Sequence, residues 1–347
     1  MTTATEAGLR QERARRAARL PWAAMARLAG RRLLAAVPVL VLVTLGMFAV
    51  AAASPFDPVR RYIGDGGAGT SQETLDALRR NLSADGTFVE QWWAWLRSAA
   101  AGDLGQSLAL RQPVGQVIGE RVGWSLLLCS VAFVVAVLLG TSLGVLAARR
   151  AGGAFDRVVT ALSYTLQAAP PFWLALLAIW LFALRLDVLP AGGLTDSGAG
   201  SAVTAGSLVR HLTLPAAVLA VSQLPWFVLY TRQGVLDALG EDPVRGARAR
   251  GLSERTVLIG HALRSGLLPV LTLIGTRIPE LITGALLVET VFSWPGIASA
   301  TVRAATATDF PLLAALTVLS ALAVLAGNLI ADLLYGLADP RVDHDEM

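Results

Sequence analysis

The chain has 347 residues, of which 54% are hydrophobic and 16% are charged, with a net charge of +4. This composition is too apolar for a soluble domain and predicts a protein that crosses a membrane several times. All 29 basic residues are arginine, so the chain lacks the lysine of a Walker A loop, and any ATP that drives it binds to another polypeptide. The arginines are spread over several loops, which does not favour nucleic-acid binding.

The titratable ligands are too few and too scattered to predict a metal site. Cys129 is the single cysteine and lies in an apolar run, which excludes a disulfide framework and a cysteine metal cluster. The three histidines, His211, His261 and His344, are far apart in the sequence. We therefore expect neither a metal nor a cofactor in this chain.

The first third of the chain contains one predicted span and a long polar segment. Residues 1–32 are rich in arginine and are predicted to lie on the cytosolic leaflet. Residues 33–53 form an apolar run long enough to span the bilayer. Residues 54–122 are predicted to form a large extracytoplasmic loop, which caps the protein and offers a surface to a partner, although a surface domain without a partner is the alternative.

Two local signals in this loop predict helices. Thr70 and Glu73 have capping-box spacing ahead of an apolar stripe. The tryptophans at 92, 93 and 95 are typical of an interfacial helix at the level of the lipid headgroups.

Residues 123–342 are predicted to form the core domain, followed by an acidic tail at 343–347. Its five apolar segments are expected to be spans two to six: residues 123–148, 158–184, 212–230, 267–291 and 311–337. We expect Pro170 and Pro171 to kink the third span. Prolines are also expected to interrupt the fourth and fifth spans, at positions 215, 225, 269 and 279.

Arginine placement predicts the orientation of these spans. With six spans and a cytosolic N-terminus, the short inner segments carry far more arginine than the two short outer loops, as the positive-inside rule requires. The sequence thus predicts an all-α membrane protein with six transmembrane helices and both termini cytosolic.

The loop at 232–267, between the fourth and fifth spans, is polar and basic, and its start and stop signals predict a firm fold. Pro243 suits the first turn of a helix, Gly251 suits its end, and Ser253 with Glu254 suits the start of a second helix. A helix, a sharp turn and a second helix indicate a docking surface. An ordinary solvated loop is the alternative from spacing alone.

The same loop resembles a known family. The segments from Arg245 to Arg255, RGARARGLSER, and from His261 to Pro269, HALRSGLLP, resemble the EAA loop of binding-protein-dependent ABC importer permeases. The dipeptide, oligopeptide and nickel branch is the nearest, because Arg245 and Gly246 depart from the general pattern as that branch does. Further similar stretches are GDLGQS at 102–107, VETVFSWPG at 288–296 and NLIADLLYGLADPR at 328–341.

This resemblance implies a subunit of an importer in the bacterial cytoplasmic membrane. It implies a second six-span permease, two cytosolic ATPases that bind ATP and magnesium, an extracytoplasmic substrate-binding protein, and surrounding lipid. In the family, a short coupling helix docks into the ATPase. The resemblance implies that Ala247 and Gly251 permit close approach and that the arginines supply charged contacts. The coupling residues it implies are Asp242, Arg245, Ala247, Arg248, Arg250, Gly251 and Leu252. The substrate implied is a di- or oligopeptide, with a nickel or metallophore complex as the alternative.

Ionisable residues inside spans are candidates for the translocation path, because a charge at the bilayer centre costs roughly 2.5–3.5 kcal/mol on insertion scales. Arg277 and Glu280 lie one helical turn apart and form a candidate pair. This pair either faces the path and contacts substrate or neutralises itself against a partner subunit. Thr283, Gln167 and Gln223 are the other polar candidates.

Two other classes of protein remain as alternatives. The segment Gly140-Thr-Ser-Leu-Gly144 fits the G-x-S-x-G pattern of a serine hydrolase inside a span, with Ser142 as nucleophile, but it needs a histidine base at the same depth. The same glycines also fit the close packing of two membrane helices. An ion-coupled secondary transporter would work without ATPases and is often built from internal repeats, which are not evident here.

Overall fold

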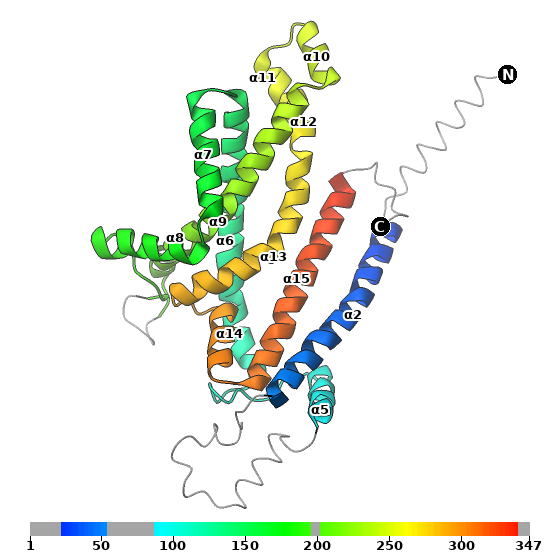
Figure 1. Ribbon diagram of the computed structural model, residues 1–347, viewed down its shortest axis with the longest axis vertical. Coiled ribbons are helices and arrows are strands. Elements are labelled where there is room, and N and C mark those ends of the chain that lie inside the picture. The colour runs from blue at the N-terminus through cyan, green and yellow to red at the C-terminus, as the bar shows by residue number, and fades with distance from the viewer. Residues whose placement is uncertain (1–21, 54–86, 196–201, 339–347) are drawn as a thin grey trace, which may run out of the picture.

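The computed structural model describes residues 22–53, 87–195 and 202–338, and in these ranges the chain is helical (Figure 1). The predicted Thr70–Glu73 helix start, residues 1–21 of the arginine-rich extension and the acidic tail lie outside the described residues. The helices are α2 (Trp22–Ala53), α5 (Phe88–Ala100), α6 (Val114–Arg149), α7 (Ala154–Ala168), α8 (Pro171–Ala178), α9 (Ala205–Leu239), α10 (Asp242–Ala249), α11 (Glu254–Val257), α12 (Leu263–Gly266), α13 (Leu268–Val291), α14 (Ile297–Thr306) and α15 (Phe310–Ala338). Two π-helical segments, Ile179–Arg185 and Leu258–Ala262, continue α8 and α11.

Five of the described helices are long and apolar enough to cross a membrane: α2, α6, α9, α13 and α15. The bent pair formed by α7 and the helix at Pro171–Arg185 raises that number to 6 if it is one span. The prediction of an all-helical protein with several spans is therefore confirmed.

The bend predicted at Pro170 and Pro171 is confirmed, and it is sharp enough to divide the predicted segment into two helices. Helix α7 and the helix beginning at Pro171 meet at 105°. A residue before proline is pushed out of the helical region, and here two prolines follow one another. Ala169 and Pro170 are extended, with ψ of 126° and 136°, and Pro171 then starts a new helix. Such a break is tolerated at membrane depth where the backbone is covered by protein or lines a cavity.

Three of the four prolines expected to interrupt the next two spans lie inside continuous helices. Pro215 and Pro225 lie within α9 and Pro279 within α13, while Pro269 lies in the first turn of α13. That part of the prediction was wrong. Neighbouring helices in a membrane protein can support a helix whose backbone has lost a hydrogen bond.

Helix α9 is the centre of the bundle, and 56% of its most apolar 18-residue stretch is buried. It packs closely on α6 at two glycines of that helix. A Cβ on Gly140 would lie 2.5 Å from the Cβ of Phe227, and one on Gly144 would lie 2.6 Å from the carbonyl oxygen of Val228. The two backbones approach each other where side chains are absent, as small residues allow in membranes.

This packing accounts for the Gly140–Gly144 pattern without a hydrolase. The one histidine on α9, His211, is buried, and its Nδ1 lies 2.9 Å from the carbonyl oxygen of Ser207. Because α9 approaches Gly140 at Phe227, His211 lies about 24 Å away along the helix axis. His261 is next to Ala262, which shares a buried cluster with Ala148, six residues and therefore about 9 Å farther along α6 than Ser142. His344 lies outside the described residues. No described histidine is thus placed as a base for Ser142.

Helix α5 confirms the helix predicted around the tryptophans. Thr87 and Glu90 form a capping box that sequence reasoning missed. Trp92 donates from Nε1 to the Thr44 hydroxyl at 3.0 Å, and the rings of Trp95 and Phe48 lie 5.8 Å apart. Two of the three tryptophans therefore fasten α5 to α2, which lies beside it in Figure 1.

The glycine contacts between α6 and α9 generate a stability prediction. Gly144→Leu should lower the free energy of unfolding by at least about 3 kcal/mol, because the new side chain collides with the backbone of α9. Gly123→Leu is the matched control, since nothing lies within 4 Å of a Cβ at that position of the same helix. The test heats each variant in detergent and uses size-exclusion chromatography to measure the fraction that remains folded. Equal loss in the two variants would contradict close packing at Gly144.

Candidate functional site

The loop after α9 folds as the helix, turn and helix that its sequence predicts. Helix α10 begins at Asp242 with Pro243 in its first turn. It ends before Gly251, whose φ of +78° lies in the left-handed region that glycine adopts without strain. Ser253 then caps α11, because its hydroxyl accepts from the backbone N–H of Thr256 at 3.3 Å. The predicted start and stop residues are confirmed.

A small apolar cluster holds α10 against the end of α9. We call it the loop cluster; its buried members are Ala148, Val235, Ala238, Val244, Ala247, Val257, Leu258 and Ala262. A helix as short as α10 is not stable in water by itself, so its folding depends on burying Val244 and Ala247 here. The loop cluster makes α10 an extension of α9 instead of a free loop.

An ion pair joins α10 to α11 across the turn. The Arg248 guanidinium donates from Nε and Nη2 to the two carboxylate oxygens of Glu254 at 2.9 and 3.1 Å. This bidentate hydrogen bonding lowers the pKa of Glu254 below its usual value and raises that of Arg248. Both groups are exposed, so the pair orients the turn more than it stabilises the fold.

A buried ion pair fixes the end of α9 that carries this loop. Arg232 on α9 contacts Asp156 on α7 through Nε–Oδ1 at 2.5 Å and Nη2–Oδ2 at 2.8 Å. Asp156 is only 2% exposed and also accepts from the backbone N–H of Gly152 at 2.8 Å. The pair ties α7 and the preceding turn to α9. Sequence reasoning missed it, although one acidic residue in a short basic turn was a usable signal.

The structure divides the predicted coupling residues into an exposed set and a buried one. Exposed residues are Asp242, Arg245, Arg250, Gly251 and Leu252, with Arg248 turned to Glu254. Ala247 is 0% exposed because it packs in the loop cluster. The expectation that Ala247 lets a partner approach closely is therefore corrected: it lets α10 approach α9.

Among the predicted pathway residues, the structure brings together Arg277 and Glu280. Their side chains form an ion pair, and the Arg277 guanidinium also lies 3.8 Å from the ring centroid of Trp226 on α9. Trp226 was not predicted; aromatic rings stabilise a cation that stacks on their face. Glu280 keeps 55% of its side chain exposed, whereas that of Arg277 is 11% exposed.

Of the remaining candidates, Thr283 lies on the same exposed face of α13 as Glu280, whereas Gln223 and Gln167 lie on other helices. Gln223 is buried on α9, and its Oε1 has no hydrogen-bond partner among the described groups. Thr283 is exposed on α13 and donates to the carbonyl oxygen of Pro279 at 3.1 Å. Gln167 lies on α7, two residues before the break at Ala169.

These features describe a membrane protein that carries a rigid basic helix at one end of its spans, and comparison with known proteins identifies its family. Residues 140–344 match the family described as binding-protein-dependent transport system inner membrane component. Residues 25–128 match the N-terminal membrane component of the same transport systems. The chain belongs to this family of inner membrane transport components.

Several relatives match over nearly their whole length. The chain is 35% identical to the oligopeptide transport system permease protein AppB of Bacillus subtilis, over 90% of this chain and 98% of that protein. It is 35% identical to a putative peptide permease protein of Brucella suis, over 90% of this chain and 97% of that protein. It is 34% identical to the dipeptide transport system permease protein DppB of Escherichia coli, over 90% of this chain and 98% of that protein.

The buried pair between α7 and α9 should be needed for stability. Asp156→Asn or Arg232→Gln should each lower the free energy of unfolding by about 3 kcal/mol, because each leaves a charge without its partner. The double variant should lose less than the sum of the two single losses. Thermal unfolding of all three variants tests this, with exposed Arg149→Gln as control. Additive losses would show that the two groups do not interact.

The turn after α10 gives a prediction about local order. Gly251→Ala should destabilise α10 by about 1–2 kcal/mol, because alanine is strained at a positive φ. Gly246→Ala, inside α10 with nothing within 4 Å of its Cβ position, should instead stabilise the helix by up to about 1 kcal/mol. Hydrogen–deuterium exchange of the α10 amides measures both changes. Faster exchange in the Gly246 variant than in the Gly251 variant would contradict the assigned turn.

Proposed function

We propose that this chain is the permease subunit of an ATP-driven importer and that α10 is its coupling helix. The observation that carries the proposal is a short basic helix fastened to the end of a membrane helix. Its outer face presents Arg245 and Arg250 to solvent, while its inner face is buried in the loop cluster. A free solvated loop would not bury one face in this way.

The proposed topology has six crossings, with the bent pair of α7 and α8 as the third, and both termini in the cytosol. The turn between α6 and α7 lies at the same end of the molecule as α10, while α5 and α14 lie at the opposite end (Figure 1). The α10 end carries exposed arginines at 149, 150, 157, 245, 248, 250 and 255. The positive-inside rule places that end in the cytosol. The large loop after α2 is then extracytoplasmic.

The proposed partners are a second permease, two ATPases and an extracytoplasmic binding protein. The relatives are named as permease proteins of peptide transport systems, which supports such an assembly for this chain. ATP and magnesium bind to the ATPases in this scheme, because this chain has no lysine for a phosphate loop. Lipid and the second permease cover the apolar side chains that α2 and α6 expose, such as Leu34, Leu42 and Leu138.

The contacts supply a route from ATP to the membrane helices. Closure of the ATPase pair pushes on the exposed face of α10. The loop cluster passes that motion to α9, and the Asp156–Arg232 pair passes it on to α7. Helix α7 leads directly into the break at Ala169, so a small rotation at the cytosolic end changes the direction of the third crossing. The pathway thereby opens alternately to each side.

The proposed cargo is a peptide, and Glu280 is the pathway residue most available to it. Relatives named for oligopeptide and dipeptide transport support peptide cargo over a nickel complex. Arg277 contacts both Trp226 and Glu280, whereas the Glu280 side chain remains 55% exposed on the surface of α13. A carboxylate in that position attracts the ammonium end of a zwitterionic peptide.

Reversing the charges on α10 should uncouple the ATPase. The double variant Arg245→Glu, Arg250→Glu should reduce substrate-stimulated ATP hydrolysis and import at least tenfold, while the chain itself remains folded, because both side chains are exposed. Arg149→Glu is the control, an exposed charge reversal at the same end but outside α10. Reconstituted complex in proteoliposomes measures both activities. Unchanged import in the double variant would contradict docking through α10, and import without any ATPase would favour an ion-coupled transporter.

A further inference from the structure

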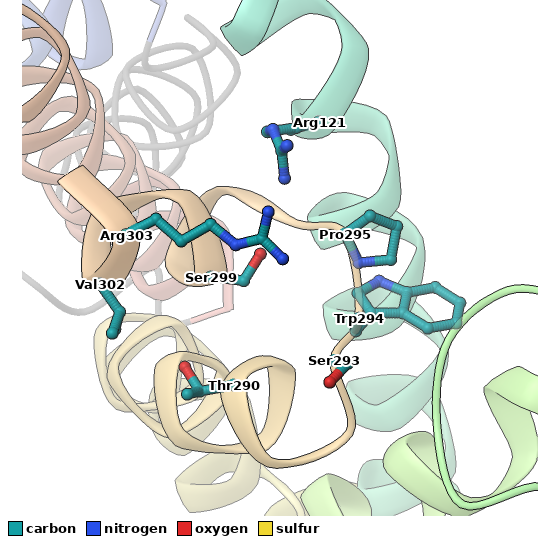
Figure 2. A pocket seen from close by; sticks show the side chains of 8 residues that line it. All are labelled: Arg121, Thr290, Ser293, Trp294, Pro295, Ser299, Val302 and Arg303. Carbon is teal, nitrogen blue, oxygen red and sulfur yellow. The ribbon is translucent and has the colours of Figure 1, made fainter. Parts of the chain in front are cut away.

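A pocket of about 240 Å³ opens at the end of the bundle opposite α10, among α6, the turn after α13, and α14. Its lining residues are Arg121, Thr290, Ser293, Trp294, Pro295, Ser299, Val302 and Arg303 (Figure 2). Under the proposed topology this is the extracytoplasmic mouth of the protein. Nothing in the coupling mechanism uses this pocket.

Two guanidinium groups converge on the pocket from different helices. Figure 2 shows Arg121, from α6, and Arg303, from α14, reaching into the same space from two sides. Within the described part of the chain, neither guanidinium group forms an ion pair or a hydrogen bond. Glu120, next to Arg121 in the sequence, and Glu289 both attract Arg121, but neither forms an ion pair with it, so the pocket keeps two unpaired cations that repel each other.

One carboxylate that acts on Arg121, that of Glu289, is committed to the fold. Glu289 is fully buried, and its Oε1 accepts from the Ser125 hydroxyl at 2.6 Å. Its Oε2 accepts from the backbone N–H groups of Ala298 and Ser299 at 2.9 and 3.2 Å, at the start of α14. A Cβ on Gly296 would lie 2.2 Å from this carboxylate, so the turn closes over it. Glu289 therefore shapes the pocket without filling it.

The pocket wall is also fixed before any ligand binds. The Trp294 indole donates from Nε1 to the carbonyl oxygen of Trp124 at 3.0 Å, and the two rings lie edge to face at 6.1 Å. Trp294 is fully buried, and so is Phe292 next to the turn. A rigid wall with two forked donors suits a planar anion, because guanidinium groups bind a carboxylate with paired hydrogen bonds.

An exposed stripe on α13 joins this pocket to Glu280. The exposed residues Thr276, Glu280, Thr283, Leu287 and Thr290 recur every three or four positions, and four of these five are polar. Polar side chains on a membrane helix normally face protein or water and not lipid. The stripe ends at Thr290 in the pocket wall, so the pocket lies at the outer end of the same path.

We propose that the pocket between Arg121 and Arg303 receives the C-terminal carboxylate of a peptide as it enters the path. This inference rests on the proposed importer function and names the chemical group that the outer mouth selects. The ligand is a carboxylate because the pocket lining offers two guanidinium donors together with the hydroxyl-bearing residues Thr290, Ser293 and Ser299. A peptide whose C-terminus is amidated lacks that charge and gains nothing from the two arginines.

The test compares free-acid and amidated forms of one peptide in the complete reconstituted transporter. Only a peptide that saturates the binding protein in both forms is used, so that delivery is equal. The wild type should import the free acid faster than the amide. Arg121→Gln and Arg303→Gln should each slow import of the free acid roughly tenfold, through loss of charge-assisted hydrogen bonds, and leave the amide unchanged.

Control variants, together with an assay of how well the binding protein docks, distinguish a carboxylate of the peptide from a carboxylate of the binding protein. Arg185→Gln, an exposed change in the segment Ile179–Arg185 and outside the pocket, should not alter either rate. Arg303→Lys should recover part of the free-acid rate because it keeps the charge. Equal loss for both peptides, with weaker docking of the binding protein, would assign the pocket to an acidic side chain of that protein and overturn the proposal. Unchanged rates in both arginine variants would overturn it as well. No ATP-dependent import of any peptide by the wild type would instead contradict the importer function itself.

Discussion

The burial of Val244 and Ala247 against the end of α9 is the contact on which the proposed mechanism depends. Without it, α10 would be a short polar helix with no reason to stay folded or to move with the membrane helices. With it, force on the outer face of α10 acts on α9, the most buried helix of the bundle. The buried Asp156–Arg232 pair extends this rigid unit to α7, which leads into the break at Ala169.

At the end opposite α10, two buried carboxylates hold the surface in shape. Glu289 on α13 joins α14 to Ser125 of α6. Asp309 accepts hydrogen bonds from the Ser107 hydroxyl at 2.6 Å and the Ala109 N–H at 2.9 Å. Asp309 thus ties the GDLGQS stretch at 102–107 to the start of α15. The GDLGQS stretch, and the VETVFSWPG stretch at 288–296 that contains Glu289, both resemble the family, and the structure gives them a physical role. Buried carboxylates of this kind persist because every oxygen has a donor.

Local signals predicted local structure well, and contacts between distant segments poorly. Pro243, Gly251 and Ser253 act within one turn of the chain, so the boundaries of α10 and α11 followed from their chemistry. The burial of Ala247, the stacking of Arg277 on Trp226 and the pairing of Asp156 with Arg232 depend on which helices become neighbours. The prolines show both outcomes: Pro170-Pro171 breaks a helix outright, whereas Pro215, Pro225 and Pro279 remain inside helices that their neighbours support.

The most direct measurement of the coupling role is photocrosslinking from α10 in native membranes. A photoreactive residue replaces Arg245 on the exposed face of α10, and a second version replaces Arg149, which is exposed at the same end but lies on α6. Mass spectrometry identifies the crosslinked proteins. We expect an adduct with an ATPase that contains a phosphate-binding loop from position 245, and much less from position 149. No ATPase adduct from position 245, or equal adducts from both positions, would contradict the assignment of α10 as the coupling helix.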